Sequence, residues 1–475
     1  MNRDEKGIAL VLVLIMLGVL SVIASSMVFV AQSETWASQN YRVMSEARYG
    51  AESAVHRASN FILYSYTVPD TAALGVYDIT TSPVRFGGSD VRLGTAGASN
   101  CVSNYPVSAD VAAFQAAASG TLQGSHTMTY DTCATLIAMR QVTEFASTTP
   151  RTVQTWRIVG EARIGGARPA HIEVSAILER QVMPMFAYAA FATDDTCGSA
   201  SGSGGLSWLG GGSTDSYDST TLAAGTTPVP DPWGGNVGTN GNLYVGGGTT
   251  VVNGTLSTPR SGVGACSSGS VTAYSGSSAA IQGDPIQLPQ RIDYPPPSPP
   301  NPLPPVGNMT IHSPTTLPPG DYGDITVNAG EVLTLQPGTY NINSIKLNGG
   351  AQIVLQPGDP IIMNVAGTGI GANQTVIDFS GGSVSGALFD PIKFQILYAG
   401  VSTVKMAGSG TTAALLYAPN AFIDNQSAGA DWYGAVIGKA VKDAGHAQIH
   451  YDRALASKAM MVGPWMLNSF NWSRF

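Results

Sequence analysis

The sequence predicts an α+β fold: a long N-terminal helix packed on an antiparallel β head, followed by a mainly-β, β-solenoid-like C-terminal module. Three observations predict it. An uncharged apolar run covers residues 8–30, and no proline occurs before Pro69. Two segments that largely alternate apolar and polar residues, 152–163 and 170–181, flank a Gly-rich turn, which is a hairpin signal. Farther on, a Pro-Gly turn followed by a β-rich run recurs at short intervals, as in stacked coils.

The composition narrows the class of protein. Of the 475 residues, 11% are charged, and the chain contains 56 glycines and 29 prolines. Many glycines with few charges favour turn-rich β structure over an ordinary helical enzyme. The net charge is -8 and no block of Lys or Arg occurs, so the electrostatic footprint of a nucleic-acid-binding protein is missing. The mild acidity suits an exported, soluble surface.

The apolar run predicts a membrane anchor. At about 1.5 Å per residue it is long enough to cross roughly 30 Å of hydrocarbon. A secretory signal peptide would have a shorter apolar core, followed by a small-residue cleavage site, whereas here Gly7 precedes the run. Arg3 and Lys6 lie before the run, and the next basic residue is Arg42. The positive-inside rule therefore places the N-terminus in the cytoplasm and the chain after Val30 outside.

The helix is expected to continue past the membrane to about Tyr64, a length of roughly 85 Å. Two ion pairs at helical spacing, Arg42–Glu46 and Arg48–Glu52, support this extension. Small and apolar residues recur at steps of three and four and form one stripe for packing on a head: Val43, Ala47, Ala51, Ala54, Ala58 and Phe61.

The C-terminal half is predicted to be β-rich. Glycines at 320, 338 and 358, each in a Pro-Gly turn, lie 18 and 20 residues apart, a plausible length for one coil. Residues 393–399, 413–419 and 433–441 are expected to be buried strands. The Pro-rich stretch 294–306 should be extended, as a domain boundary or as a long surface strap.

Four cysteines are expected to form two disulfides in an exported chain. The order along the chain suggests Cys101–Cys133 and Cys197–Cys266, although four cysteines allow three connectivities.

The start of the chain, MNRDEKG followed by the long apolar helix, resembles PilX/GspK-like minor members of the type IV pilins and type II secretion pseudopilins. Residues 307–456, and the segment 422–455 above all, resemble Gly-rich β-helix-type modules attached to PilX-type N-termini. The resemblance implies a class III leader that a prepilin peptidase cleaves between Gly7 and Ile8, with N-methylation of Ile8. It also implies single-pass insertion in the inner membrane, and later display on the cell surface within a pilus. The implied partners are major and minor pilins and the inner-membrane assembly platform.

The expected organisation is a leader at 1–7, a transmembrane and assembly helix at 8–64, a pilin-like α+β head at 65–190, a Gly/Ser-rich β region at 191–284, a Pro-rich linker at 285–306, a β-solenoid-like module at 307–456 and a C-terminal tail at 457–475.

Leu12 departs from the resemblance, because the fifth mature position is usually Glu in major pilins. That glutamate is thought to neutralise the N-terminal amine of a neighbouring subunit, and a carboxylate in the membrane is costly unless it is paired. A subunit with leucine there avoids this cost but cannot pair with a subunit ahead of it. Leu12 therefore predicts a tip or initiating subunit. The alternative is a membrane-anchored surface protein that never enters a filament.

Two groups of side chains are weak candidates for metal binding. His446, His450 and Asp452 alternate along a predicted strand and would share one face. Acidic residues near Cys197 leave calcium open, as in GspK-like heads, although no EF-hand spacing occurs: Asp194, Asp195, Asp215 and Asp218.

No cofactor and no active site are predicted. No GxSxG motif lies on a strand-to-helix turn, and the carboxylates of the repeat region look scattered. The sequence thus predicts a structural, adhesive, non-enzymatic minor pilin whose β-rich surface suits a surface glycan or another surface. The alternatives are a GspK-like pseudopilin, or a membrane-anchored carbohydrate-binding or carbohydrate-active β-helix protein.

Overall fold

The computed structural model describes residues 3–68, 73–147, 150–166, 169–199, 204–223, 226–262, 264, 266, 272–276, 280–386, 388–406, 408, 410–426 and 429–474. The chain divides into two compact units. Unit 1 comprises Met1–Val142, Arg151–Gln181 and Pro464–Phe475, and unit 2 comprises Thr143–Pro150 and Val182–Gly463. The fold is mixed α+β, with one long N-terminal helix and a large β-rich region, as the sequence predicts.

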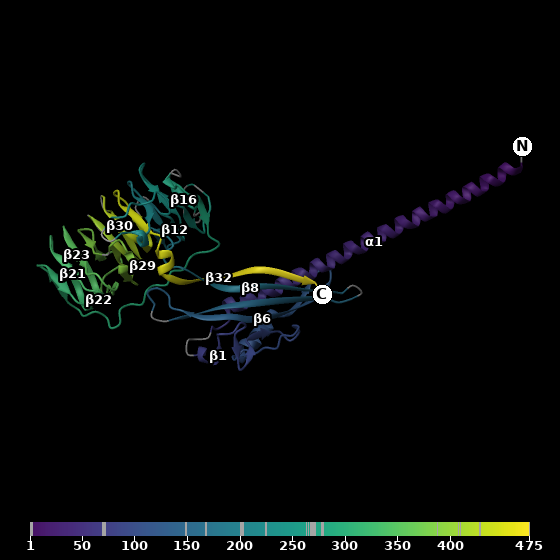
Figure 1. The fold of residues 1–475 in the computed structure, drawn as a ribbon, viewed down its shortest axis with the longest axis horizontal. Coiled ribbons are helices and arrows are strands. Elements are labelled where there is room, and N and C mark those ends of the chain that lie inside the picture. Colours follow the sequence, from purple (N-terminus) through teal and green to yellow (C-terminus); the bar gives the residue numbers. More distant parts are fainter. Residues whose placement is uncertain are drawn as a thin grey trace. The chain divides into compact units, whose positions relative to one another are not determined.

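Unit 1 is organised by helix α1 (Arg3–Tyr64), a single helix of 62 residues without proline. Its N-terminal part projects from the β-sheet of this unit (Figure 1). The predicted stripe is buried: Ala47, Ala51, Ala54 and Ala58 are completely inaccessible, and Val43 and Phe61 are nearly so. Both predicted ion pairs along the helix are present, with N–O distances of 3.4 Å for Arg42–Glu46 and 2.8 Å for Arg48–Glu52.

Helix α1 packs on an antiparallel sheet. Strands β7 (Arg151–Ile164) and β8 (Ala170–Pro184) form the predicted hairpin, with Arg163 opposite His171 in register. Within the described residues the sheet has six strands in the order β32-β8-β7-β6-β4, with β5 also paired to β6. The other members are β4 (Arg92–Gly94), β5 (Gly120–Gln123), β6 (Thr127–Val142) and β32 (Met460–Arg474).

The smaller elements of unit 1 lie around this sheet. Helix α2 (Ser108–Ala118) packs on α1 through Phe114, whose ring meets Phe61 edge-on at a centroid distance of 5.5 Å. A 3-10 turn, η1, and a small antiparallel sheet occupy the preceding loop: η1 (Ala73–Val76), β1 (Tyr77–Asp78), β2 (Arg85–Phe86) and β3 (Ser89–Asp90).

Helix α1 and the sheet pack so closely that little space remains between their backbones. Gly160 on β7 faces the backbone of Ala51, and a Cβ atom at this position would lie 3.0 Å from the Cβ of Ala54. A Cβ on Gly50 of α1 would in turn lie 2.9 Å from the Cβ of Ala162. Because neither side has room for a further methyl group, glycine on both surfaces sets the helix–sheet distance.

Unit 2 consists mainly of short parallel strands. Within the described residues one sheet contains nineteen strands and a second contains four, β19-β21-β23-β26. In the first part of the unit the strands are β9 (Ala190–Ala192), β10 (Leu206–Trp208), β11 (Ser213–Tyr217), β12 (Val237–Thr239), β13 (Leu243–Val245), β14 (Val251–Val252), β15 (Leu256–Thr258), β16 (Tyr274–Gly276) and β17 (Pro285–Gln287), with a 3-10 turn η2 (Ser219–Thr221).

The predicted repeat forms two parallel ladders that the chain visits alternately. One ladder contains β18 (Asn308–Ile311), β20 (Gly320–Val327), β22 (Gly338–Leu347) and β24 (Ile361–Val365). The other contains β19 (Thr315–Leu317), β21 (Val332–Leu335), β23 (Ala351–Leu355) and β26 (Gly382–Ser385). Ser344 lies opposite Asp324 and 20 residues beyond it, so each pass along the ladder advances by about the repeat length seen in the sequence.

The three predicted buried strands are confirmed. They are β27 (Phe394–Tyr398), β29 (Thr411–Asn425) and β30 (Asp431–Asp443), and they pair in parallel in that order. The remaining elements of the unit are β25 (Thr375–Asp378), η4 (Pro391–Lys393), β28 (Thr403–Lys405), β31 (Gln448–Asp452) and α3 (Leu455–Lys458). Parallel strands buried on both faces explain the continuous apolar runs.

The segment around the Pro-rich stretch lies along unit 2. Ile292 exchanges two hydrogen bonds with the side chain of Asn240, each of 2.9 Å. The ring of Tyr294 is buried against Phe191 at a centroid distance of 4.8 Å, and the hydroxyl of Tyr417 donates to the carbonyl of Pro295. Of the two sequence-based interpretations, these contacts correspond to the strap.

Residues 457–475 are expected from the sequence to be a tail, but the structure places the strand β32 there, in the sheet of unit 1. Trp465 and Leu467 pack against the core of that unit. Gly463 and Pro464 interrupt the sequence at the start of this strand, which hides its strand character.

Candidate functional site

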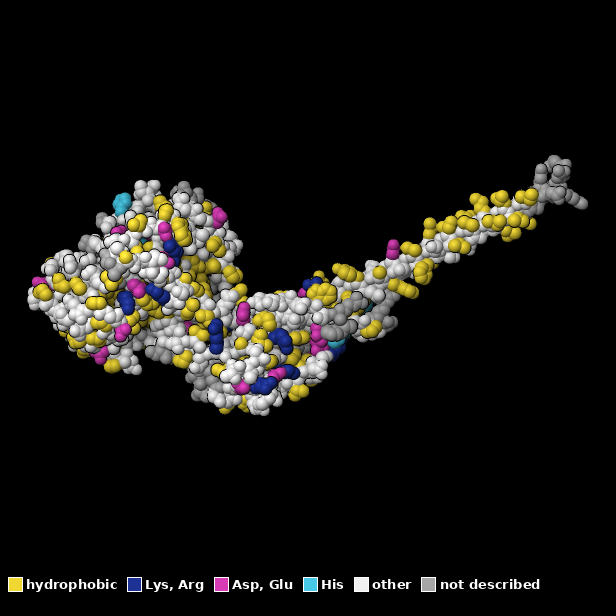
Figure 2. Space-filling view, in the orientation of Figure 1, with side chains coloured by type: hydrophobic (Ala, Val, Ile, Leu, Met, Phe, Trp, Pro, Cys, Tyr) yellow, Lys and Arg dark blue, Asp and Glu magenta, His cyan; other side chains and the backbone are white. Residues whose placement is uncertain are grey.

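The exposed part of α1 is the most unusual surface of the molecule. Ile8 is 68% exposed and Val30 is 51% exposed, and the apolar side chains between them cover the projecting helix (Figure 2). The segment has a mean hydropathy of 2.9 over its most apolar window, none of which is buried, so α1 is long and apolar enough to cross a membrane. An apolar surface of this kind needs lipid or another protein to cover it.

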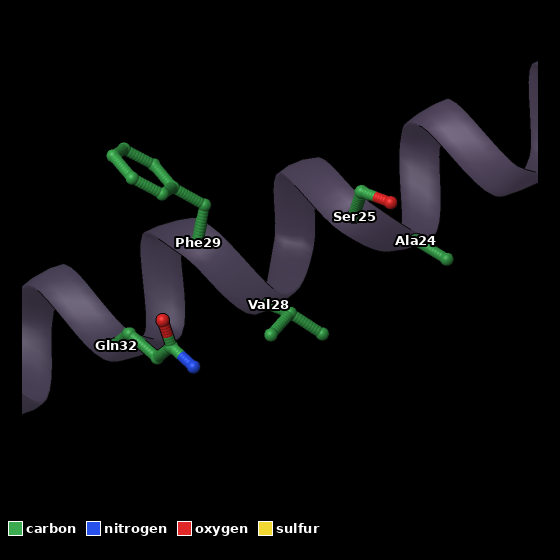
Figure 3. Close-up of a pocket in the computed structure, with 5 residues that line it drawn as sticks. All are labelled: Ala24, Ser25, Val28, Phe29 and Gln32. Carbon is green, nitrogen blue, oxygen red and sulfur yellow. The ribbon is translucent and has the colours of Figure 1, made fainter.

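Two hydroxyl side chains of the projecting helix, those of Ser25 and Thr35, bond to the helix itself. The hydroxyl of Ser25 donates to the carbonyl of Ser21 at 2.8 Å, and that of Thr35 donates to Ala31 at 2.8 Å. Figure 3 shows the small side chains of Ala24 and Ser25 beside Val28 and Phe29. A hydroxyl that bonds to the preceding turn, as that of Ser25 does, brings no unmet donor into an apolar environment.

The positions singled out in the sequence at the start of α1 lie in one continuous helix. Gly7 belongs to α1, although the surroundings of residues 1–7 lie outside what the structure describes. Leu12 is 62% exposed and points away from the helix axis with its apolar neighbours. The cleavage between Gly7 and Ile8 and the methylation of Ile8 stay predictions.

A charged cluster ties α1 to the head where the helix leaves the sheet. The carboxylate of Glu46 accepts hydrogen bonds from Ser125 and from Nδ1 of His126, the latter at 2.9 Å, and Arg42 donates to Ser125 at 2.6 Å. The hydrogen bonds from Ser125 and His126 lower the pKa of Glu46 to about 2. A cavity of about 550 Å³ lies beside this cluster, between Gln39 and Gly166.

Both disulfides have the connectivity that chain order suggests. Cys101–Cys133 joins the loop after β4 to strand β6 in unit 1, and Cys197–Cys266 joins two loops of unit 2. Each links residues within one unit, so each constrains that unit alone.

The predicted His446, His450 and Asp452 group does not share one environment. His446 precedes β31 and has a positive φ of 64°, so it does not continue the alternation of the strand. His450 is buried, with Nδ1 at 2.5 Å from Oδ1 of Asp215 on β11 and Nε2 at 3.6 Å from Oδ1 of Asp431 on β30. Burial lowers the pKa of His450, but the hydrogen bonds and charges of Asp215 and Asp431 outweigh it and raise the pKa to about 9.

Asp452 has a separate role at a chain reversal. Its carboxylate accepts from the backbone N–H of Ser219 at 3.0 Å and from the Ser219 hydroxyl at 2.6 Å, and the ammonium of Lys458 reaches that hydroxyl at 3.3 Å. These bonds hold η2 against the end of β31. Sequence reasoning missed these contacts, because Ser219 lies more than two hundred positions from both Asp452 and Lys458 and nothing in its own neighbourhood marks it as their partner.

The acidic residues near Cys197 are dispersed. Asp194 accepts the backbone N–H of Thr196, Asp195 pairs with Arg291 at 3.1 Å, and Asp218 accepts the N–H of Thr220 in η2. Asp215 faces His450 instead. Among the residues that the structure describes, the group with the spacing of three metal ligands is a different one, Glu161, His171 and Glu173.

A buried acid lies among the parallel strands of unit 2. Asp443, at the end of β30, is completely inaccessible, and Oδ1 accepts a hydrogen bond of 3.0 Å from Asn425, its neighbour in register on β29. Burial raises the pKa of Asp443 well above its ordinary value. Sequence reasoning treated Asp443 as one of several scattered carboxylates, since no local pattern shows that a strand end will be covered.

Unit 2 also has a mixed apolar and charged pocket of about 350 Å³. Leu222, Leu355 and Leu388 supply apolar surface, and Asp359 and Lys393 supply charges. Leu388 is 61% exposed and has a positive φ of 51°. Such a pocket offers apolar contact together with hydrogen-bonding groups, which is what small polar ligands require.

Comparisons with known proteins are sparse. A family model described as a domain of unknown function, DUF7305, matches residues 320–458, which is less than half of the chain. No curated protein matches the sequence. A competence-associated pilin, ComZ from Thermus thermophilus, aligns over 91% of this chain and 98% of its own length, with 12% sequence identity and a TM-score of 0.26. At that TM-score the alignment carries no argument about fold or function.

Proposed function

We propose that this chain is a minor type IV pilin-like subunit with a structural and adhesive role, placed at the tip of a filament or at its initiation. The observation that carries the proposal is the division of α1 into two parts. Residues 8–30 expose a continuous apolar surface, whereas the stripe from Val43 to Phe61 is buried on an antiparallel sheet. One helix thus belongs to two environments, a folded head and an apolar phase outside it.

The proposed sequence of events uses both parts of α1. The apolar part holds the subunit in the inner membrane while the head folds outside. A prepilin peptidase removes residues 1–7, and Ile8 becomes the methylated N-terminus. The assembly platform then transfers the helix from lipid to a bundle of pilin helices. Both environments cover the apolar surface, so the transfer exposes little of it to water.

Leu12 supports a place outside the filament shaft. Its side chain carries no charge that could neutralise the N-terminal amine of another subunit. A subunit of this kind incorporates without that ion pair at the end of the filament, where no subunit lies ahead.

Unit 2 is the proposed display module. Its alternating parallel ladders, with coils of about 20 residues, support the interpretation as a β-solenoid. We propose that it acts in binding and not in catalysis, with a surface glycan as the ligand class. The pocket between Leu222 and Lys393 is the proposed contact. Depolymerisation of a glycan by the purified protein would instead favour a carbohydrate-active enzyme.

Substitution of Gly7 tests the pilin-type processing. We expect Gly7→Val to leave the chain about seven residues longer, measured by intact mass after expression with the peptidase, and to remove the protein from sheared surface filaments. Gly18→Val is the matched control, because it changes a glycine of the same helix with nothing within 4 Å of a new Cβ. Normal processing and piliation of the Gly7→Val strain would contradict the proposal.

Immunogold labelling of filaments tests the position. Label restricted to filament ends is expected, and label along the shaft would contradict a tip or initiating role. A type II secretion pseudopilin remains the second candidate. Loss of protein secretion without loss of pili on deletion of the gene would favour it.

A further inference from the structure

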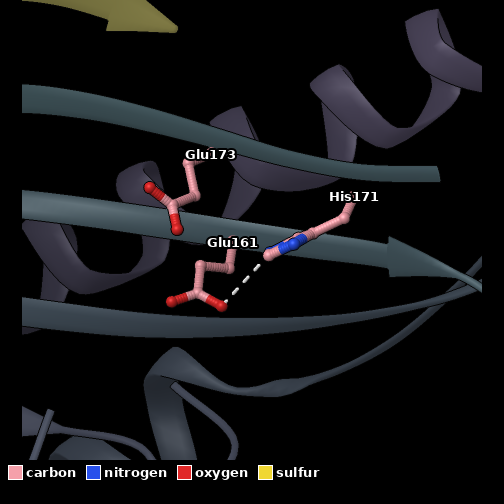
Figure 4. Close-up of side chains that lie close together, drawn as sticks. All are labelled: Glu161, His171 and Glu173. Carbon is pink, nitrogen blue, oxygen red and sulfur yellow. Dashed lines mark ion pairs between the residues drawn. The ribbon is translucent and has the colours of Figure 1, made fainter. Parts of the chain in front are cut away.

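Three side chains outside the surfaces described above form a compact group of metal-ligand type. Glu161 lies on β7, and His171 and Glu173 lie on β8, with ligand atoms all within 4.8 Å of one another. The three side chains project from the same face of the sheet (Figure 4).

Strand geometry explains why these residues meet. His171 and Glu173 are two residues apart on one strand, so they point to the same face. Glu161 lies directly opposite Glu173 in the antiparallel register, and Arg163 lies opposite His171. Two paired strands hold all three ligands, so the group is fixed by the sheet and not by a mobile loop.

The Glu161 carboxylate is held in place before any ion arrives. Its side chain is only 3% exposed. Ser99 donates to it twice, from the backbone N–H at 2.8 Å and from the hydroxyl at 2.9 Å, and Arg163 donates at 2.5 Å. Of these bonds, the two from Ser99 orient the carboxylate as outer-shell bonds do in known metal sites, whereas Arg163 occupies Oε2, the oxygen that lies 3.4 Å from Nε2 of His171.

The spacing between imidazole and carboxylate fits a small divalent ion. Nε2 of His171 lies 3.4 Å from Oε2 of Glu161. Two ligands bonded to zinc at about 2.0–2.1 Å in a tetrahedron are separated by about the same distance. The local charge also favours a cation, because Asp131 lies opposite Glu161 on the neighbouring strand and completes a row of three carboxylates.

We propose that Glu161, His171 and Glu173 form a zinc-binding site in the head, with the fourth position open to water. Imidazole nitrogens and carboxylate oxygens are both zinc ligands, whereas calcium prefers six to eight oxygen ligands. His171 is 27% exposed, which gives an ion access from solvent. The bound ion would join β7 to β8 close to their turn and stabilise unit 1.

Arg163 competes with the ion for the Glu161 carboxylate, so a substitution at Arg163 provides a further test of the proposal. Removing a carboxylate ligand should weaken zinc binding, whereas removing the competing guanidinium should strengthen it.

The test uses the full chain in detergent, stripped with a chelator and titrated with zinc chloride in a calorimeter. We expect the wild type to bind one equivalent of zinc. In Glu173→Gln and in His171→Ala this binding should be lost, or the affinity for zinc should fall by at least about tenfold. Glu179→Gln, on the same strand, should bind zinc as the wild type does. Arg163→Gln should bind it more tightly.

A thermal readout separates binding from misfolding. Zinc should raise the unfolding temperature of unit 1 in the wild type and in Glu179→Gln, but not in Glu173→Gln, whose circular dichroism spectrum without metal should match the wild type. Equal zinc binding by wild type, Glu173→Gln and His171→Ala would overturn the proposal, as would calcium binding at this site without zinc binding.

Discussion

The two units stabilise charged groups in different ways. In unit 1, Glu46 lies at the surface of the helix–head junction and is held ionised by Ser125, His126 and Arg42. In unit 2, His450 and Asp443 are buried between parallel strands. The two units should therefore respond to pH in opposite directions: acid should weaken unit 1, and alkali should weaken unit 2.

The largest expected effect is at His450. Its folded-state pKa of about 9 lies above the ordinary value of 6.5, so its contribution is complete below about pH 6.5 and is lost as the pH rises to about 9. We expect His450→Ala to destabilise unit 2 by about 3 kcal/mol at pH 6, because Asp215 and Asp431 lose the charge between them. Hydrogen exchange measured by mass spectrometry on peptides of unit 2 gives the value.

His446→Ala is the matched control, since His446 lies close to His450 in the chain but is exposed. It should alter stability by no more than about 0.5 kcal/mol. Equal effects of the two histidine substitutions would show that the buried contacts of His450 contribute nothing.

The next effect is steric and belongs to unit 1. Gly160→Ala places a methyl group against Ala51 and Ala54 and should destabilise the helix–sheet contact by about 1–3 kcal/mol. Gly165→Ala, in the β7–β8 turn, meets nothing within 4 Å and should have little effect. Hydrogen exchange of peptides that cover the α1 stripe and β7 compares the two. A tolerant Gly160 would mean that α1 can move away from the sheet without loss.

A smaller effect is expected at Asp443. Because burial raises its folded-state pKa, its ionisation in the unfolded chain lowers stability as the pH rises above about 4. Asp443→Asn should therefore resist alkali better than the wild type, by on the order of 1 kcal/mol at pH 8, and should differ little from it at pH 3.5. Asp284→Asn, at an exposed site, should show no such pH dependence. A difference that is constant with pH would contradict burial as the cause.

The smallest expected effect is at Glu46, and its pH dependence is opposite: stability is lost in acid and not in alkali. Its pKa of about 2 lies below the ordinary 4.5, so its contribution is present above about pH 4.5 and is lost as the pH falls to about 2. Glu46→Gln should remove this acid sensitivity from the Ser125–His126 turn, measured by hydrogen exchange of peptides spanning residues 120–130. If the wild type and Glu46→Gln are equally protected from exchange at both pH 3 and pH 6, the hydrogen bonds to Glu46 contribute too little stability to be measured.

The elements of the fold that have a local sequence pattern could be predicted from the sequence. The helix stripe of α1 and the hairpin of β7 and β8 follow from local periodicity, and the strands β27, β29 and β30 follow from short continuous apolar runs. The strand β32 did not, because its pairing partner β8 lies far away in the sequence and Gly463 and Pro464 interrupt the strand pattern of the sequence.

The candidate sites also divide into those that a local pattern reveals and those that depend on contacts between distant segments. Pairs such as Arg42–Glu46 are visible in the sequence because helical spacing brings them together. The Glu161, His171 and Glu173 group depends on the register between two strands, and His450 meets Asp215 across more than two hundred residues. Alternation along the predicted strand placed His450 and Asp452 on one face, but it could not show which residues lie opposite them.

The return of the chain from unit 2 to β32 has a consequence for the order of synthesis. The sheet of unit 1 receives its edge strand only after the ribosome has made residues 182–463. Until then β8 presents an unpaired edge, and unit 2 can fold while the head is still incomplete. Folding of this protein would therefore finish with unit 1, whose last strand is made after all of unit 2.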